Sequence, residues 1–326
     1  MLPDLLIVVG GALLILVLAE IVLRETLALM AHYRVSASFV GLTVLSIGTS
    51  LLEIVTHVIG SVQILHAPES MDTLSGLLIG SNIGSDILQQ NFVLPLAGLI
   101  GSVVVVRRLL VVEVGGLIAA SCLLWLACAG GAVTRVEGLL LVLAYAGYLT
   151  YVARTGAHTG RVAHARRLGR PRRYRAMAVV ALAFAAMAWV ADPVLLAATR
   201  LVARLPLSAS FFGVIVLGVA ATLPELMTAL VSIARGQRDI SAGILIGSNI
   251  TNPLLGVGLG ALISGYTAPT VTVYYDLPVK VATGVLLYFF LRRRNGLGRP
   301  EAVALILAYI AYVALRPLLF PEDLPQ

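Results

Sequence analysis

Stretches of about 20 apolar residues recur along the whole 326-residue chain. A helix needs about 20 such residues to cross the hydrocarbon core of a bilayer. Because lipid cannot satisfy backbone hydrogen-bonding groups, a chain that spans it must form helices or a closed barrel. Barrel strands would alternate polar and apolar residues, and these stretches do not. The sequence therefore predicts an all-α, polytopic membrane protein.

The low content of charged residues supports a chain that lies mostly in lipid. Charged residues make up only 12% of the chain and hydrophobic residues 59%, whereas a soluble domain carries about 25% charged residues. The formal net charge is +7, which in a soluble protein can indicate nucleic-acid binding. Here we interpret it as the positive charge of cytoplasmic loops in a membrane protein. The expected surroundings are a lipid bilayer, with no nucleic-acid partner.

The apolar stretches predict about ten transmembrane helices. Their expected bounds are Leu5–Leu23, Ser38–Leu65, Thr73–Ile100, Leu109–Ala129, Val136–Ala153, Ala176–Ala197, Ser208–Ile233, Ile240–Ser264, Leu277–Leu291 and Glu301–Leu315.

The arginine-rich loop Arg154–Arg175 sets the expected orientation. If this loop is cytoplasmic, ten helices place both termini outside and most of the 23 Lys and Arg residues inside, as the positive-inside rule requires. The basic residues left outside are Arg135, Arg200, Arg204, Lys280 and Arg316.

The same loop divides the chain into two halves of five helices. Residues 1–153 form the expected first half, residues 154–175 a basic cytoplasmic linker, and residues 176–326 the second half. An odd number of helices per half reverses the orientation of the second half. This is the inverted-topology arrangement that is frequent in secondary transporters.

Two blocks of sequence occur once in each half. The first block reads GLTVLSIGTSLLE at Gly41–Glu53 and GVIVLGVAATLPE at Gly213–Glu225. The second reads DTLSGLLIGSNI at Asp72–Ile83 and DISAGILIGSNI at Asp239–Ile250. Repetition at this length indicates an internal duplication.

The duplicated blocks each contain a glutamate deep in an apolar stretch, Glu53 and Glu225. A charge near the bilayer centre costs about 2.5–3.5 kcal/mol or more, so such residues are usually functional. Inverted symmetry would bring the two acids together, and two like charges about 5 Å apart repel by roughly 3 kcal/mol at a dielectric of 20. A divalent cation, two monovalent cations or protons can neutralise them. Competition among these ions is ion exchange.

The two motifs resemble those of the cation/Ca²⁺ exchanger superfamily, specifically the prokaryotic sodium/calcium exchangers. That family carries Gly-Thr-Ser-x-Pro-Glu followed by Gly-Ser-Asn-x-x-Asn/Asp in each half. The resemblance implies a Ca²⁺/Na⁺ antiporter with a midplane site in a prokaryotic-type plasma (inner) membrane. It assigns Glu53 and Glu225 as ion-binding carboxylates. The other implied ligand positions are Thr49, Ser50, Ser81, Ser85, Ala221, Thr222, Ser248 and Asn252.

Four departures from the family pattern bear on this site. Leu52 replaces the proline, which predicts a less sharp break in the first helix, and Ala221 lacks a hydroxyl. Ser85 is shorter than the usual Asn, and Asn252 is neutral where exchangers often have Asp. The site thus holds two carboxylates and not three, unless Asp86 supplies a third from a rotated helix. Na⁺ and H⁺ both stay open as the counter-ion.

Other functions remain as alternatives. The nearest is an H⁺-coupled exchanger of Ca²⁺ or another cation, in which His57, one turn beyond Glu53, either relays protons or makes a polar contact. A cation channel would use the same oxygens. An intramembrane enzyme would need a nucleophile–base pair or a metal-binding motif, and we find neither, so we expect no enzymatic activity and no cofactor. Gln89, Gln90 and Asn91 are expected to form interhelical hydrogen bonds. The oligomeric state is left open.

Overall fold

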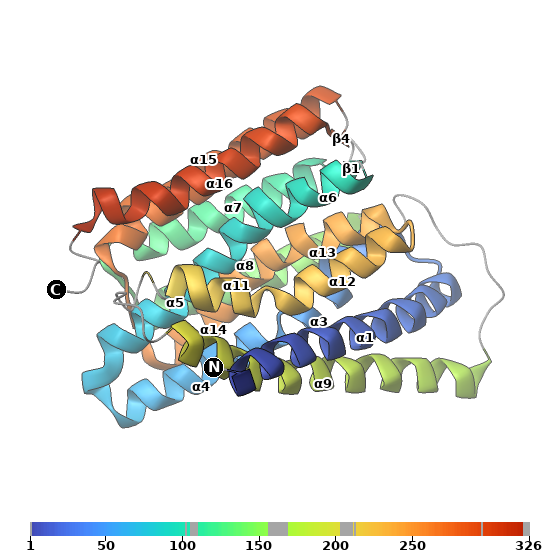
Figure 1. Ribbon diagram of the computed structural model, residues 1–326, viewed down its shortest axis with the longest axis horizontal. Coiled ribbons are helices and arrows are strands. Elements are labelled where there is room, and N and C mark those ends of the chain that lie inside the picture. Colours follow the sequence, from blue (N-terminus) through green and yellow to red (C-terminus); the bar gives the residue numbers. More distant parts are fainter. Residues whose placement is uncertain are drawn as a thin grey trace.

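The computed structural model describes residues 2–101, 103–104, 110–155, 169–202, 211, 213–294 and 296–321. Helices dominate these residues and lie side by side along one common direction, with α1 and α9 along one edge and α15 and α16 along the other (Figure 1). In the same view α1 begins and α16 ends toward the left. The predicted all-α fold is confirmed.

The elements of the first half, with π-helical and 3₁₀ segments written η, are α1 (Leu2–Tyr33), α2 (Ala37–Val40), η1 (Gly41–Leu45), α3 (Ser46–Thr49), α4 (Leu51–His66), η2 (Pro68–Ser70), α5 (Met71–Leu88), η3 (Gln89–Val93), α6 (Leu94–Gly101), β1 (Val103–Val104), α7 (Leu110–Cys128), β2 (Ala132–Val133) and α8 (Arg135–Thr155).

Those of the second half are α9 (Arg170–Val202), η4 (Gly213–Leu217), α11 (Gly218–Ala221), α12 (Leu223–Ala234), α13 (Arg238–Thr251), η5 (Asn252–Val257), α14 (Gly258–Ser264), β3 (Tyr266–Thr267), η6 (Thr272–Asp276), α15 (Leu277–Arg294), β4 (Gly296–Leu297) and α16 (Arg299–Leu319). The expected starts at Leu109 and Ser208, and most of the linker 154–175, lie outside the described residues.

Several of these helices can cross a membrane. Within the described residues seven helices are long and apolar enough, and counting each of two bent helix pairs as one span raises the number to nine. The expected span Thr73–Ile100 is helical throughout but is not among them. The segment Arg238–Ser264 is almost wholly enclosed by its neighbours, because it runs through the centre of the bundle.

The two bent pairs are the two copies of the first duplicated block. The helix breaks at Ser50 with a bend of 44°, and its counterpart breaks at Thr222 with a bend of 46°. The prediction that Leu52 makes the first break less sharp is therefore wrong. Ser50 has φ −77° and ψ 3°, which interrupts the helix without a proline. The break in the first copy therefore does not depend on a proline.

Small residues let the halves cross closely. A Cβ on Gly84 of α5 would lie 2.0 Å from the carbonyl oxygen of Val214 in η4, and one on Gly218 would lie 2.8 Å from Gly84. At the matching crossing, a Cβ on Gly41 would lie 3.0 Å from the Cα atom of Gly243 in α13. Glycine permits this backbone contact between membrane helices. Each crossing joins a copy of the first block to the other half's copy of the second block or, for Gly84, to the residue directly after it.

Two short antiparallel sheets also join the halves. Strand β1 pairs with β4, with Val103 opposite Leu297, and β2 pairs with β3, with Val133 opposite Tyr266. Exchanging the halves converts one pair into the other, because β1 and β3 follow the third helical segment of each half and β2 and β4 follow the fourth. A duplicated architecture predicts this correspondence.

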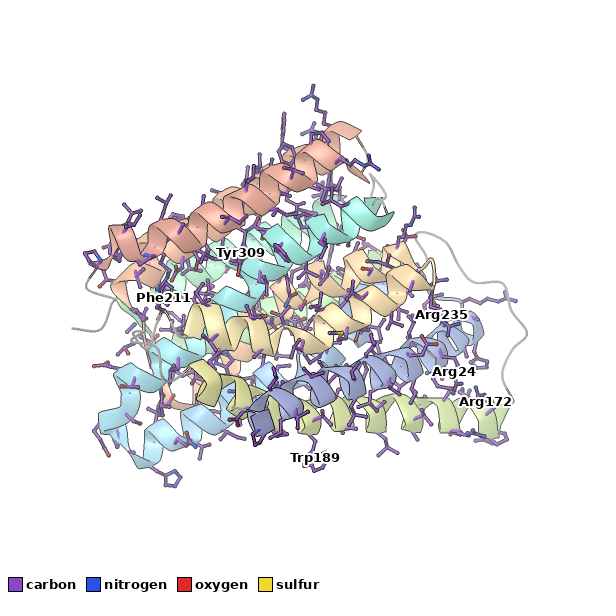
Figure 2. The ribbon with its side chains drawn as sticks, in the orientation of Figure 1. Arg24, Arg172, Trp189, Phe211, Arg235 and Tyr309 are labelled. Atoms are coloured by element: carbon purple, nitrogen blue, oxygen red, sulfur yellow. The ribbon has the colours of Figure 1, made fainter. Side chains whose placement is uncertain are left out.

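Arginines expected in the cytoplasm gather at one end of the bundle. Figure 2 shows Arg24, Arg172 and Arg235 together at the right. Arg172 of α9 pairs with Glu25 of α1 at 2.9 Å, and Arg235 after α12 pairs with Glu20 of α1. These ion pairs tie α1 to both neighbouring helices. Arg204 lies outside the described residues.

Two basic residues expected at the outer face are instead buried. Arg316 donates to Asp276 through Nε at 2.9 Å and through a second guanidinium nitrogen at 3.1 Å, and the Tyr312 hydroxyl donates to the same carboxylate. Lys280 is also fully buried and pairs with Asp86. Charge counting assigned both to the outer side, but basic residues can be buried in a membrane protein when an acid there compensates them.

Candidate functional site: a buried set of oxygen ligands

The two duplicated glutamates lie directly after the two helix breaks. Glu53 is in the first turn of α4 and Glu225 in the first turn of α12, and their side chains are 5% and 0% exposed. Ser50, at the first break, donates a hydrogen bond of 3.2 Å to Glu225 from the other half. Glu225 also acts electrostatically on Glu53. The folded chain therefore brings the acids of both halves to one buried place.

Glu53 has an unusual environment for a buried acid. Ser85 and Asn252 lie beside Glu53. Neither of its carboxylate oxygens, however, accepts a well-formed hydrogen bond from any residue that the structure describes. Among the described residues, one oxygen of Glu225 and the amide oxygen of Asn252 are also buried without hydrogen-bond partners. Buried polar atoms in proteins nearly always have partners. These oxygens are free to ligate a cation.

A cavity of about 50 Å³ adjoins Glu53. Ser81, Asn82 and Ala221 line it together with His57. Ala221 lacks a hydroxyl there, but the cavity has room for more than one water molecule. The two predicted positions Ser81 and Ala221 thus lie near Glu53 without bonding to it.

The remaining hydroxyls form a second layer. The Thr222 hydroxyl donates to the carbonyl of Gly218 at 2.7 Å, and its oxygen lies 3.0 Å from the Ser85 hydroxyl. Thr49 donates to the carbonyl of Leu45 at 3.0 Å, and it lies close enough to Glu225 to act on that carboxylate. Their lone pairs remain available to a cation while their protons are held by other oxygens.

Gln89 lies at the centre of this network and was not among the predicted site residues. Its amide nitrogen donates to Ser85 at 3.0 Å, and its amide oxygen accepts hydrogen bonds from Ser248 at 2.5 Å and Asn249 at 3.4 Å. It therefore joins α5 of the first half to α13 of the second, which confirms the expected interhelical hydrogen bonds. A buried amide within an apolar span was the only sequence feature that could have pointed to it.

We expect Gln89→Leu to weaken Ca²⁺ binding by roughly tenfold, because Ser85 and Ser248 lose a partner that orients them and one lost buried hydrogen bond costs about 1–3 kcal/mol. The measurement is the half-saturating Ca²⁺ concentration for ⁴⁵Ca²⁺ uptake into proteoliposomes. Gln63→Leu, at an exposed position of α4, is the control and should leave it unchanged. An unaltered half-saturation in Gln89→Leu would remove Gln89 from the site.

His57 makes the polar contact that the sequence left as one of two alternatives. Its Nδ1 lies 3.1 Å from the Tyr266 hydroxyl, which in turn lies 2.7 Å from the Ser61 hydroxyl. This network links α4 to β3 and fixes the imidazole beside the cavity.

The chemistry of the set suits a hard cation. Carboxylate, hydroxyl and amide oxygens are the ligands that Ca²⁺ prefers. Among the described residues no group of three or more His, Cys, Asp and Glu side chains has the geometry to hold a metal ion. The set consists of two carboxylates among neutral oxygens.

Comparison with known proteins identifies the family of this chain. The model of the family described as "Sodium/calcium exchanger protein" matches residues 4–154 and 175–317. The chain belongs to this family. It is a transporter family, so the chain is not an enzyme, and its membrane location follows from the same membership.

Two curated relatives match most of the chain, and a third matches a shorter region. The inner membrane protein YrbG of Escherichia coli is 27% identical over 323 residues, 95% of this chain and 96% of its own. The putative antiporter CaxA of Alkalimonas amylolytica is 26% identical over 86% of this chain and 88% of its own. The sodium/calcium exchanger MaX1 of Methanosarcina acetivorans is 30% identical over a shorter region, 32% of this chain and 29% of its own.

Solved structures share the fold. A structure of the sodium-calcium exchanger NCX_Mj soaked with Na⁺ and Sr²⁺ superposes with a TM-score of 0.76 over 96% of this chain and 98% of its own, at 23% identity. The arrangement of helices is thus that of a polytopic helical exchanger.

Proposed function

We propose that this exchanger moves Ca²⁺ against Na⁺ by alternating access, and that Glu53 and Glu225 bind both ions in turn. The observation that carries the proposal is the meeting of the two buried acids across the two halves, with Ser50 of one half bonded to Glu225 of the other. The family membership supports cation/Ca²⁺ exchange.

Mutual repulsion of the two acids explains why one ion load must replace another. Both carboxylates are buried, so leaving both charged without a cation is unfavourable. One Ca²⁺ or two monovalent cations neutralise them equally in charge, and the two loads compete for the same oxygens. A change of access on either side of the bilayer then needs a filled site. This is how a carrier couples two ions.

The direction of the gradient that drives uptake tests the proposal. Proteoliposomes loaded with Na⁺ and diluted into Na⁺-free buffer containing ⁴⁵Ca²⁺ should accumulate Ca²⁺ at least tenfold above vesicles with equal Na⁺ on both sides. The Na⁺ gradient supplies the free energy, so a Na⁺ ionophore should abolish the accumulation.

The alternatives give different outcomes in the same vesicles. If a pH gradient drives the accumulation of Ca²⁺ and Na⁺ has no effect on it, the counter-ion is H⁺ and not Na⁺. Unlabelled Ca²⁺ outside should also speed the exit of ⁴⁵Ca²⁺ from loaded vesicles, because a carrier returns faster when loaded. Exit that ignores external Ca²⁺ would indicate a channel.

A further inference from the structure

A buried ion pair adjoins the proposed site. Asp86 follows Ser85 in α5, and Lys280 lies in the first turn of α15. Both side chains are fully buried, and the Lys280 ammonium donates to Oδ2 of Asp86. Asn252 donates to Oδ1 of the same carboxylate at 3.1 Å. Both oxygens of Asp86 thus have partners, whereas both oxygens of Glu53 have none among the described residues.

Asp86 is part of the electrostatics of the site. It acts on Glu53 and on Glu225, and Lys280 is the charged side chain that acts on Asp86 within the described part of the chain. The charges of Glu53, Glu225, Asp86 and Lys280 therefore influence one another and must be summed together. Because Lys280 and Asp86 sum to zero wherever the proton between them resides, the mobile ions face the two charges of Glu53 and Glu225.

The pair is held in place by its surroundings. Gln90 donates to the carbonyl of Lys280 at 3.1 Å and to the Thr283 hydroxyl at 2.7 Å, and Asn91 donates to the same hydroxyl at 3.0 Å. The start of α15 is thereby fastened to η3, directly after α5. These bonds fix the backbone at Lys280, whose fully buried ammonium lies against Asp86.

We propose that Lys280 is a tethered cation that permanently occupies the third carboxylate of this site and so sets the exchange at one Ca²⁺ for two monovalent cations, with no net movement of charge. The inference rests on the proposed function. It identifies Lys280 and Asp86 as stoichiometry-determining residues that bind no transported ion themselves.

The equilibrium of the wild-type exchanger measures this number directly. With a tenfold Na⁺ gradient, a two-for-one exchange should hold Ca²⁺ at a ratio of about 100-fold across the vesicle membrane. A K⁺ gradient with valinomycin imposes the membrane potential. The Ca²⁺ ratio should stay constant as the potential is varied. A three-for-one exchange would instead change the ratio tenfold for each step of about 59 mV, the value for one charge.

Variants test the charges separately. Asp86→Asn leaves the ammonium uncompensated and should raise the half-saturating Ca²⁺ concentration at least tenfold. The double variant Asp86→Asn/Lys280→Met restores the balance of two charges and should recover to within about threefold of wild type. Lys280→Met alone frees Asp86 and should make the Ca²⁺ ratio sensitive to potential. Arg135→Met removes a positive charge at an exposed position of α8 and serves as the matched control.

The outcomes separate the inference from the proposed function. The role of Lys280 is overturned if the wild-type Ca²⁺ ratio shifts tenfold for each 59 mV step of potential. It is also overturned if the double variant has the same half-saturating Ca²⁺ concentration as Asp86→Asn. In both cases Na⁺-driven uptake, and with it the proposed function, still stands. An Asp86→Asn protein with unchanged half-saturation overturns the role of Lys280 as well. Failure of any Na⁺ gradient to drive ⁴⁵Ca²⁺ uptake contradicts the proposed exchange, and with it the inference.

Discussion

Glu53→Gln and Glu225→Gln should each reduce ⁴⁵Ca²⁺ uptake below detection while the protein still inserts and purifies as a folded monodisperse species. Each change keeps the shape of the side chain and removes one of two charges that face the ion. At about 4 Å and an effective dielectric of 20, one unit charge pair contributes roughly 4 kcal/mol, and a divalent ion loses more. The loss of affinity is therefore expected to exceed about 1000-fold.

Glu69→Gln is the matched control, because Glu69 lies exposed in η2 and should transport as wild type does. Uptake above roughly a tenth of the wild-type rate in either site variant, at saturating Ca²⁺, would remove that glutamate from the ion-binding site. Thermal melting in detergent separates a lost ligand from a lost fold. A buried carboxylate turned into an amide should leave the melting temperature equal or raise it, since the repulsion between the acids disappears.

Gly84→Ala should destabilise the protein by about 3 kcal/mol and abolish transport. The added Cβ would lie 2.0 Å from the carbonyl oxygen of Val214 and 2.6 Å from its carbonyl carbon. Backbone atoms cannot rotate away as a side chain can, so α5 and η4 must separate. Because η4 leads through α11 to the break before Glu225, the same displacement moves an acid of the site.

Gly147→Ala is the control for this change. A Cβ at Gly147 in α8 meets no atom within 4 Å, and replacing a helical glycine by alanine generally stabilises by about 0.5–1 kcal/mol. Melting temperatures of both variants in the same detergent give the comparison. Equal stability of Gly84→Ala and wild type would show that α5 and η4 do not cross as closely as the structure describes.

Much of the fold was readable from local patterns. The apolar stretches predicted helices, because each span needs its own run of apolar residues whatever its neighbours are. The duplicated blocks predicted which segments correspond, and the motifs predicted the family, which the match over residues 4–154 and 175–317 confirms. The two glutamates stood out because a lone acid in an apolar span is costly.

The tertiary structure decided what depends on distant partners. Leu52 suggested a weaker break than Pro224, yet the bends are nearly equal at 44° and 46°. Ser50, at the first break, bonds to Glu225 of the other half, a contact that the local sequence does not show. Lys280 was assigned to the outer face because counting charges treats each residue alone. Its burial is possible only beside Asp86, 194 positions earlier in the chain. No local pattern can show which distant acid will compensate a buried base, because that pairing exists only once the helices have packed.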